Sequence, residues 1–469
     1  MQRFYYDDLS WKPEIGKTGK PVYKEIISAL RRDIKEGALK PGDRLPPQRE
    51  LADFLGINLS TVTRAFKICE QKGLIYATVG KGTFVSADIE AGEAGETADG
   101  AAAPHLVDLG MIYPLYNRDE EIIEAMRHVA LSDEIEQCLS YDAPQKRRAD
   151  GQTGAAWIEK MNYHVQPEHV FAVAGVQNAL AIALTSLFSA GDKIAVDSYT
   201  YTGFKNLAYM LGIRLVPVEA DAQGMDPDAL RKICTTDKIR GVYLMPECQN
   251  PTATTMPRKR RMLLAEVIRE RGLIHMEDDT YAFLKNTGLE PVSAFVPEQS
   301  VYISGTSKAL SAGLRVAFLS SAQQYCAKVL LAVHNINLMT APFNTEVVSY
   351  LVRTGVADRI IRRKQEEAEA RNALANDILA GFDLRGNKRD YFRWLKLPTP
   401  WTGRELEYRA KEKGVSVFCA EKFIVGSGQA EAAVRLSLSA AASRIDLQQG
   451  LMVLRDILEE RLDTSPFII

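Results

Sequence analysis

The sequence lacks the short motifs that mark several common kinds of site. Its six cysteines form no C-x-x-C pair and its six histidines form no H-E-x-x-H pair, so neither a disulfide framework nor a zinc site is indicated. It contains no G-x-G-x-x-G turn and no P-loop, which argues against nicotinamide and nucleotide chemistry. No apolar run reaches the roughly 18 residues of a membrane span, and the N-terminus has no signal-peptide core. We therefore expect a cytoplasmic protein with no metal and no membrane partner.

A strong net charge is also absent, but the charge is unevenly distributed. The chain of 469 residues carries −2 in total. Residues 1–86 hold 15 lysines and arginines against 10 acidic residues, a charge of +5, which leaves −7 for the remainder. A basic segment at one end of a chain is typical of a nucleic-acid-binding module. The length favours two or three domains.

The basic segment predicts three helices. Apolar residues recur at helical spacing over residues 22–35, a short helix is expected over 48–55, and a third over 59–72, with Asn58 placed to cap it. Residues 74–85 alternate and turn at glycine, which predicts a two-stranded wing. Two helices joined by a tight turn, the second with a polar and basic outer face, are typical of a helix-turn-helix. A three-helix protein-interaction module is the alternative.

Three runs of residues, 42–52, 61–66 and 80–85, resemble the winged helix-turn-helix of the GntR regulators. The resemblance covers about residues 20–86, and we assign residues 1–86 to this domain. It implies that the domain binds a double-stranded DNA operator. The DNA-binding side chains that it implies are Arg44, Arg49, Ser60, Thr61, Thr63, Arg64 and, on the wing, Lys81.

A linker is expected next, over residues 87–104. It holds five acidic residues, no lysine or arginine, and a single large apolar residue, Ile89. Such a segment cannot bury enough apolar surface to order itself, so we expect a flexible acidic tether between two domains.

Beyond the linker, short apolar runs alternate with helix-length stretches, which predicts an α/β domain with a mostly parallel sheet covered on both faces. The expected strands cover residues 169–173, 193–196, 214–218, 241–245, 273–276, 300–303 and 316–320. Ligands of such sheets bind at the carboxyl ends of the strands.

Polar and aromatic residues follow the ends of these strands. The segment Gly175-Val176-Gln177 turns into a helix N-terminus, which suits an anion. Lys308 follows the sixth strand, and a lysine among small residues can form an imine with a carbonyl. The other strand-end residues are Tyr201, Asn250, Asp278, Tyr281, Ser307 and Arg315. Each alone is explained by an ordinary turn, cap or core edge, but together, at one edge of one sheet, they predict a cofactor site.

This order of residues resembles the fold-type I pyridoxal phosphate enzymes, and most nearly their aminoadipate and kynurenine aminotransferase branch, over about residues 107–460. The resemblance implies pyridoxal 5'-phosphate as cofactor, with Lys308 forming the Schiff base and Asp278 pairing with the pyridinium nitrogen. It further implies that Asn250 and Tyr281 bond the phenolic oxygen and that Tyr201 stacks on the ring. The implied phosphate ligands are Arg315, Ser307 and the backbone around Gly175, Val176 and Gln177.

The sequence departs from that family at three places. Gly305 stands three residues before the lysine, where serine or threonine is usual, and Val176 stands where a small hydroxyl residue is common. Thr252-Ala253 replaces the usual Thr-Gly after Asn250-Pro251. We expect the loss of phosphate-binding hydroxyls to loosen the cofactor somewhat.

A smaller C-terminal domain is expected over about residues 351–469, after a large domain over about 105–350. Strands are predicted over 391–397, 415–419 and 433–438, and a helix over 357–379. Arg435 on the last strand resembles the family's arginine that binds the α-carboxylate of an amino acid. The alternative is an exposed strand arginine.

A GntR-like winged helix joined to an aminotransferase-like domain is the architecture of the MocR regulators, which this chain resembles over nearly its whole length. The resemblance implies a head-to-tail homodimer that senses pyridoxal phosphate, or an amino acid or amine effector, through the Schiff base at Lys308. Two alternatives remain. One is a working aminotransferase of the 2-aminoadipate or kynurenine type with an appended DNA-binding module, and the other is a repressor that does not use the cofactor.

Overall fold

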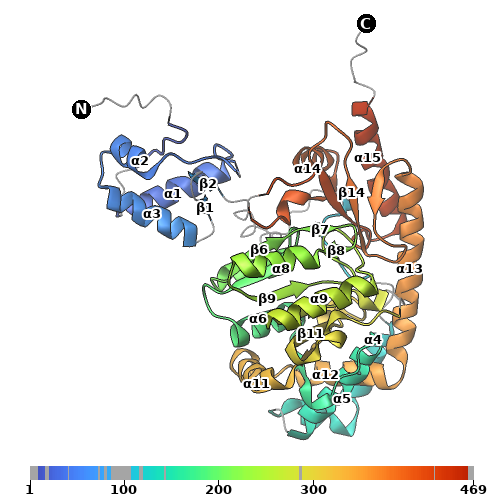
Figure 1. The fold of residues 1–469 in the computed structure, drawn as a ribbon. Coiled ribbons are helices and arrows are strands. Elements are labelled where there is room, and N and C mark those ends of the chain that lie inside the picture. The colour runs from blue at the N-terminus through green and yellow to red at the C-terminus, as the bar shows by residue number, and fades with distance from the viewer. Residues whose placement is uncertain are drawn as a thin grey trace. The chain divides into compact units, whose positions relative to one another are not determined.

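The computed structural model describes residues 9–15, 21–40, 42–71, 74–78, 82–85, 107–115, 120–141, 144–284, 288–426 and 428–462 (Figure 1). Lys81 and residues 87–104 lie outside these ranges, so the predicted wing-tip contact and linker stay predictions. Residues 1–98 form most of one compact unit, and residues 99–423 with 430–469 form the other. No described helix is long and apolar enough to cross a bilayer.

The N-terminal unit has the predicted order of three helices and a hairpin. Its elements are α1 (Val22–Lys35), α2 (Gln48–Leu55), α3 (Leu59–Gln71), β1 (Ile75–Thr78) and β2 (Gly82–Val85), with the two strands antiparallel. Gly56 ends α2 in the left-handed conformation at φ 62°, which glycine adopts without steric cost. Asn58 Oδ1 accepts a hydrogen bond from the Ser60 amide at 2.9 Å, so the predicted cap of α3 is confirmed.

The second unit is built on a seven-stranded sheet in the order β4-β12-β11-β10-β9-β5-β6. The strands are β4 (Val170–Val173), β12 (Ala317–Ser321), β11 (Ser300–Gly305), β10 (Ile274–Asp278), β9 (Ile239–Leu244), β5 (Lys193–Asp197) and β6 (Arg214–Val218). Only β12 runs antiparallel to its neighbours, β11 and β4. The prediction of a mostly parallel sheet is therefore confirmed.

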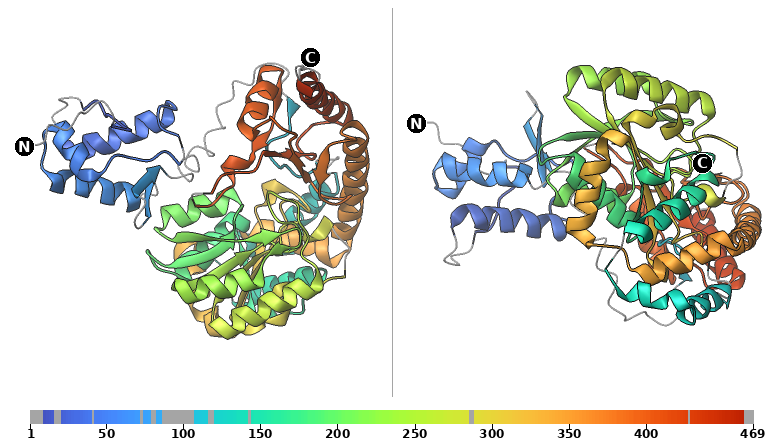
Figure 2. Two further views of the ribbon diagram at one scale, coloured as in Figure 1. Left: turned by 45° about the horizontal axis from the view of Figure 1, so that its top comes forward. Right: turned by 90° about the horizontal axis from the view of Figure 1, so that it is seen from below.

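Helices cover both faces of this sheet, as Figure 2 shows. Trp157 of α5 donates a hydrogen bond to Ser304 on β11 at 3.0 Å, whereas the next residue, Gly305, faces Val176 of α6. Because successive residues of a strand point to opposite faces, α5 and α6 lie on opposite sides. The helices of this region are α4 (Glu120–Ala130), α5 (Pro144–Glu159), α6 (Val176–Leu187), α7 (Thr202–Met210), α8 (Pro227–Thr236), α9 (Arg258–Arg271), α10 (Val292–Phe295), α11 (Gln323–Asn337) and α12 (Pro342–Arg353). A hairpin of β7 (Ala220–Asp221) and β8 (Gly224–Met225) follows β6.

The C-terminal part holds a four-stranded antiparallel sheet in the order β13-β14-β17-β16, packed against three helices. Its elements are β13 (Asp383–Arg385), β14 (Phe392–Lys396), β16 (Phe418–Cys419), β17 (Ala433–Ser437), α13 (Val356–Ile378), α14 (Gly403–Glu412) and α15 (Arg444–Leu462). The single strand predicted over 415–419 is wrong in detail. Val415–Ser416 forms a separate strand, β15, which pairs in parallel with β3 (Val107–Asp108), so one sequence run serves two sheets.

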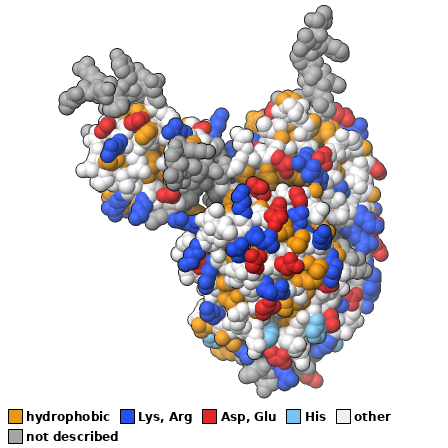
Figure 3. All heavy atoms as spheres, viewed as in Figure 1, with side chains coloured by type: hydrophobic (Ala, Val, Ile, Leu, Met, Phe, Trp, Pro, Cys, Tyr) orange, Lys and Arg blue, Asp and Glu red, His pale blue; other side chains and the backbone are white. Residues whose placement is uncertain are grey.

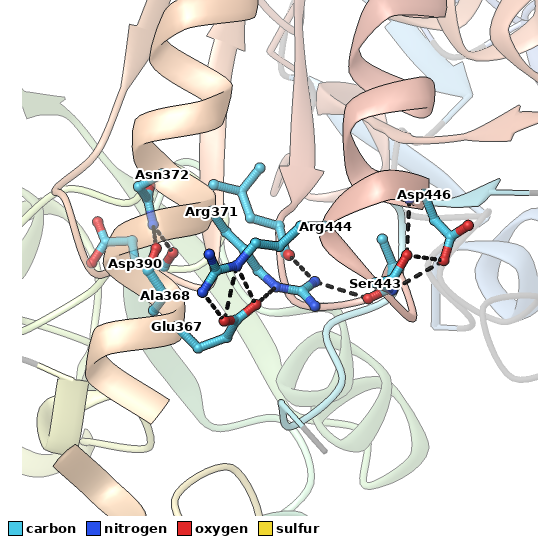
Figure 4. Close-up of polar contacts among 10 residues, drawn as sticks. Glu367, Ala368, Arg371, Asn372, Asp390, Ser443, Arg444 and Asp446 are labelled. Carbon is cyan, nitrogen blue, oxygen red and sulfur yellow. Dashed lines mark hydrogen bonds and ion pairs between the residues drawn. The ribbon is translucent and has the colours of Figure 1, made fainter. Parts of the chain in front are cut away.

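The long helix α13 is tied to the start of α15 by a partly buried polar cluster (Figure 4). Glu367 accepts hydrogen bonds from Arg371 at 2.8 Å and from Arg444 at 2.5 Å. Arg371 also donates to the carbonyls of Leu438 and Ala441. The chain that follows β17 is therefore fixed to the helix that leads in from the large domain.

Candidate cofactor site and nucleic-acid interface

Lys308 lies in the loop after β11, where it is surrounded by other cations. Its ammonium group donates a hydrogen bond to the carbonyl of Ile112. Burial, together with the smaller effects of the charges of Arg435, Arg315 and Lys364, lowers the pKa of Lys308 to about 8. A lysine with a pKa near neutrality has a larger unprotonated fraction, which is the form that attacks a carbonyl.

Asp278, at the end of β10, is 3% exposed and accepts three hydrogen bonds. Tyr243 donates its hydroxyl to Oδ2 at 3.0 Å. Thr280 donates both its amide, at 3.1 Å, and its hydroxyl, at 2.5 Å, to Oδ1. Burial raises the pKa of Asp278, and the three hydrogen bonds oppose that rise.

Tyr201, Tyr281 and Asn250 lie around the same space. The ring of Tyr201 lies against Gly203, where an added Cβ would be 2.4 Å from Tyr201 Cζ. Burial raises the pKa of Tyr201 and, more strongly, that of Tyr281, and both rings feel the charges of Asp278 and Arg435. Arg435 also donates a hydrogen bond to Asn250. The three side chains, which follow three different strands, therefore lie close to the same charged groups.

The side chain of Gln177 is engaged by protein groups and does not point to a free anion site. Its side chain accepts a hydrogen bond from the Tyr201 hydroxyl at 3.2 Å and donates to the carbonyl of Gly203 at 2.9 Å. The side chain thus orients Tyr201, and only the backbone of Gln177 remains a candidate for an anion. The helix α6 begins at Val176, so the amides of its first turn lack intrahelical partners.

The predicted phosphate end of the site comprises Gly175, Ser307 and Arg315. Gly175 has φ +91°, and a Cβ on it would be 2.6 Å from a terminal nitrogen of Arg315. The close approach of the guanidinium therefore requires glycine. The Ser307 hydroxyl is buried and has no hydrogen-bond partner among the described residues, which is the state expected of a group that awaits a ligand.

Two of the departures seen in the sequence form one feature. A Cβ on Gly305 would be 2.6 Å from Cγ2 of Val176. The valine methyl therefore fills the space in which the side chain of a serine or threonine at position 305 would start. The third departure, Ala253, adopts φ +57°, a conformation that is strained for a residue other than glycine.

Arg435 is buried, with 4% of its surface exposed, so the alternative of an exposed strand arginine is wrong. It donates to Asn250 Oδ1 and to the carbonyl of Gly110, each at 2.7 Å. The rings of Phe392, Phe418 and Phe423 lie 4.7–5.8 Å from the guanidinium carbon. Burial lowers the pKa of Arg435 to about 10, and its Nε has no hydrogen-bond partner among the described residues.

The sequence reasoning missed several neighbours of these groups. For the cofactor site, the prediction considered only residues that come directly after the strands of the large sheet. It therefore missed Tyr243, Gly110 and Lys364. Lys364, on α13, donates to the carbonyl of Leu310 at 2.7 Å. Helical spacing gives no sign that this lysine is buried beside Lys308, because its neighbours on α13 include many exposed charged residues.

The residues present fit pyridoxal phosphate. A buried carboxylate suits the ring nitrogen, and a lysine of lowered pKa suits the aldehyde. The unpartnered hydroxyl of Ser307 and the guanidinium of Arg315, which lies against Gly175, suit the phosphate. No group of three or more metal-ligating side chains was found in the described part of the chain.

In the N-terminal unit, most of the predicted DNA-binding side chains are exposed. Arg44, Arg49, Ser60, Thr63 and Arg64 are exposed and Thr61 is half-buried, whereas Lys81 lies outside the described residues. The guanidinium of Arg64 lies 4.3 Å from the ring of Tyr23. Thr63 donates to Gln48 Oε1 at 2.8 Å, so the first turn of α2 and α3 share one polar surface.

Comparisons with known proteins support both parts of the chain. Residues 104–454 match the family described as aminotransferase class I and II, and residues 22–85 match the bacterial regulatory proteins of the gntR family. The uncharacterized HTH-type transcriptional regulator YdeF of Bacillus subtilis is 36% identical over 96% of this chain and 97% of its own length.

Two further proteins are similar to this chain over part of its length. The vitamin B6 salvage pathway transcriptional repressor PtsJ of Salmonella typhimurium is 27% identical over 68% of this chain and 71% of its own length. The crystal structure of LysN, an α-aminoadipate aminotransferase of Thermus thermophilus complexed with N-(5'-phosphopyridoxyl)-L-leucine, is 27% identical, has a TM-score of 0.68, and covers 76% of this chain and 93% of that chain. The chain therefore belongs to the MocR-type GntR regulators, in which a winged helix-turn-helix is joined to a pyridoxal phosphate-binding domain of the aminotransferase class I and II family.

Proposed function

We propose that this chain is a transcriptional regulator whose operator binding responds to pyridoxal phosphate at Lys308, or to an amino compound that reacts there. The observation that carries the proposal is the burial of Lys308, Asp278 and Arg435 around one space, in a chain that also has an intact DNA-binding unit. The name of the relative PtsJ favours the cofactor as signal, and the ligand of the LysN crystal structure favours an amino acid.

Each residue of the site has a proposed task. Lys308 supplies an unprotonated amine, and Asp278 holds a proton at the ring nitrogen. Asn250 and Tyr281 bond the phenolic oxygen, and Tyr201 covers the ring. Ser307, Arg315 and the amides from Gly175 to Gln177 bind the phosphate. When bound, pyridoxal phosphate supplies an aldehyde carbon that amines attack and a ring that accepts electron density.

Arg435 is the proposed site for the carboxylate of an amino-acid effector. A carboxylate there must compete with Asn250 Oδ1 and the Gly110 carbonyl for the guanidinium. Asn250 follows β9 of the large sheet, whereas Arg435 lies on β17 of the small one. The exchange of partners therefore changes a contact between the two parts, and this gives the effector a different affinity for the two arrangements.

We also propose a head-to-tail homodimer in the cytoplasm. Large apolar side chains are exposed on α11 and on the segment after α4: Leu139 is 83%, Tyr141 77% and Leu331 63% exposed. Tyr141 and Leu338 line one cavity of about 350 Å³, so the two segments adjoin. Figure 3 shows hydrophobic side chains gathered over α11. A surface of this kind is typical of a subunit interface, and Leu331→Glu should yield monomers in sedimentation experiments.

The proposal is tested with purified protein reconstituted with pyridoxal phosphate. The wild type should be yellow and should be labelled at Lys308 after borohydride reduction, and Lys308→Ala should lose the label. Arg64→Ala should abolish binding to DNA fragments selected with the wild type while the cofactor spectrum stays unchanged. Arg31→Ala, an exposed arginine on α1, is the matched control. A colourless wild type would contradict the cofactor assignment, and an unchanged DNA shift by Arg64→Ala would contradict the recognition helix.

A working aminotransferase is the second candidate, because Lys308, Asp278, Tyr281 and Arg435 are all brought together. Multiple-turnover kinetics with panels of amino acids and keto acids, run beside DNA binding with the same compounds, separates the two. Sustained turnover with no effect on DNA would favour the enzyme.

A further inference from the structure

The carboxylate of Asp278 is the most completely hydrogen-bonded group of the site before any ligand is considered. A carboxylate has about four acceptor positions. Two on Oδ1 are taken by the amide and hydroxyl of Thr280, and one on Oδ2 is taken by the Tyr243 hydroxyl. One position remains, on Oδ2.

Tyr243 is held rigidly as a donor. Its ring stacks on that of Phe204, with centroids 3.8 Å apart and planes 7° from parallel. Both side chains are at most 1% exposed. Burial and the charge of Asp278 raise the pKa of Tyr243 well above its usual value, so the phenol keeps its proton at any physiological pH.

Thr280 lies in the turn directly after β10 and reaches back to Asp278 with two groups. Any residue except proline at position 280 could donate the hydrogen bond from its backbone amide. The hydrogen bond from the side-chain hydroxyl, at 2.5 Å, needs serine or threonine. The side chain therefore adds one donor that the backbone alone does not supply.

The three donors act against the effect of burial. A buried carboxylate favours its neutral form, and hydrogen bonds to the anion favour the charged form. Among the residues that the structure describes, the other titratable groups that interact with Asp278 are the phenols of Tyr201 and Tyr281, which remain neutral and supply no compensating positive charge. Keeping Asp278 ionised therefore depends on its immediate donors.

We propose that Tyr243 and Thr280 are positioning residues that keep Asp278 ionised and leave one acceptor position, on Oδ2, for the protonated ring nitrogen of the cofactor. The inference rests on the proposed function, since it takes pyridoxal phosphate as the ligand. It goes beyond that function by naming the residues that decide where the ring proton resides.

The test measures the ring proton and not activity. Pyridoxal phosphate labelled with ¹⁵N in the ring is bound to the wild type and to Tyr243→Phe, Thr280→Val and Thr280→Ser. The ¹⁵N chemical shift is then followed against pH. Borohydride labelling of Lys308 is measured beside it, so that a failure to bind the cofactor is seen separately.

We expect the Phe and Val variants to lower the proton affinity of the ring nitrogen about tenfold each, the size expected for one hydrogen bond to a charged group. Thr280→Ser should behave as the wild type, because it restores the hydroxyl. The same ¹⁵N profile in all four proteins would overturn the proposal. So would loss of the cofactor from a folded Phe or Val variant, because positioning donors alter the proton and leave the attachment to Lys308 in place. A wild type without Lys308 labelling would instead contradict the proposed function.

Discussion

The two ends of the cofactor site differ in how complete they are. At the ring-nitrogen end, Asp278 is 3% exposed and receives three hydrogen bonds. At the phosphate end, Arg315 is exposed and makes one long bond, at 3.3 Å, to the Ala174 carbonyl, while the hydroxyl of Ser307 has no partner among the described residues. The first end is preorganised, whereas the second is completed by its ligand. Each interaction at the buried ring-nitrogen end should therefore contribute more binding free energy than an interaction at the exposed phosphate end.

The largest effect is expected from Asp278→Asn, at the preorganised end. Removing one partner of a buried charge pair costs about 3–5 kcal/mol, so pyridoxal phosphate affinity should fall by about two to four orders of magnitude. Phosphate-free pyridoxal should lose the same factor, because it keeps the ring nitrogen. Absorbance titration measures both, and a loss confined to pyridoxal phosphate would contradict the assignment.

The pH dependence of cofactor capture probes Lys308, which lies between the two ends. The amine reacts when unprotonated, and its pKa is lowered to about 8. The capture rate should therefore rise about tenfold per pH unit up to about pH 8, and then level off. Arg315→Gln removes a nearby cation and should move the midpoint to higher pH. Stopped-flow absorbance checks this, and a rate still rising steeply at pH 10 would show an ordinary lysine.

A smaller effect is expected from Arg315→Gln at the phosphate end. The guanidinium is exposed, so its bond to phosphate is partly screened by water, and we expect about a tenfold loss of pyridoxal phosphate affinity. Pyridoxal binding should be unchanged. A loss confined to the phosphorylated ligand differs from the equal losses expected for Asp278→Asn, and equal losses for both ligands would show that the two ends are not separate.

The smallest effect concerns Gly305 and Val176. Gly305→Ser alone should lower the free energy of unfolding by about 1–3 kcal/mol, because its side chain overlaps the valine methyl. Adding Val176→Ala should recover most of the loss, and the new hydroxyl should tighten the cofactor a few-fold. Denaturant unfolding of the four proteins in a double-mutant cycle measures the coupling. Additive effects would show that the two side chains do not share one space.

Much of the fold followed from local patterns. The bounds predicted for α1 and α2 are those of the structure, and the seven predicted strands of the large sheet all occur. Helical spacing and strand length are set by neighbours in the chain, which the sequence displays directly. The strand-end rule also placed Asp278 and Lys308 at one edge of the sheet, because parallel strands bring their carboxyl ends together. Arg315 reaches the same edge from the start of the antiparallel strand β12.

Other features depend on pairs that are far apart in the chain. Arg435 donates to Gly110, 325 residues away, and Tyr243 donates to Asp278 from the neighbouring strand. The run 415–419 is divided between two sheets because β3 returns from residue 107 to pair with half of it. No periodicity within a segment reports which distant segment will lie beside it.

The sequence by itself determined the family, the order of domains and the type of residue at each strand end, because motifs and periodicity are local properties of the chain. Only the tertiary structure decided the packing, the hydrogen bonds and the charged neighbours of those residues. It placed Val176 in the space beside Gly305, gave Asp278 three donors, and surrounded Lys308 with cations. Proton affinity and close packing depend on what lies within a few ångströms in space, and those neighbours come from every part of the chain.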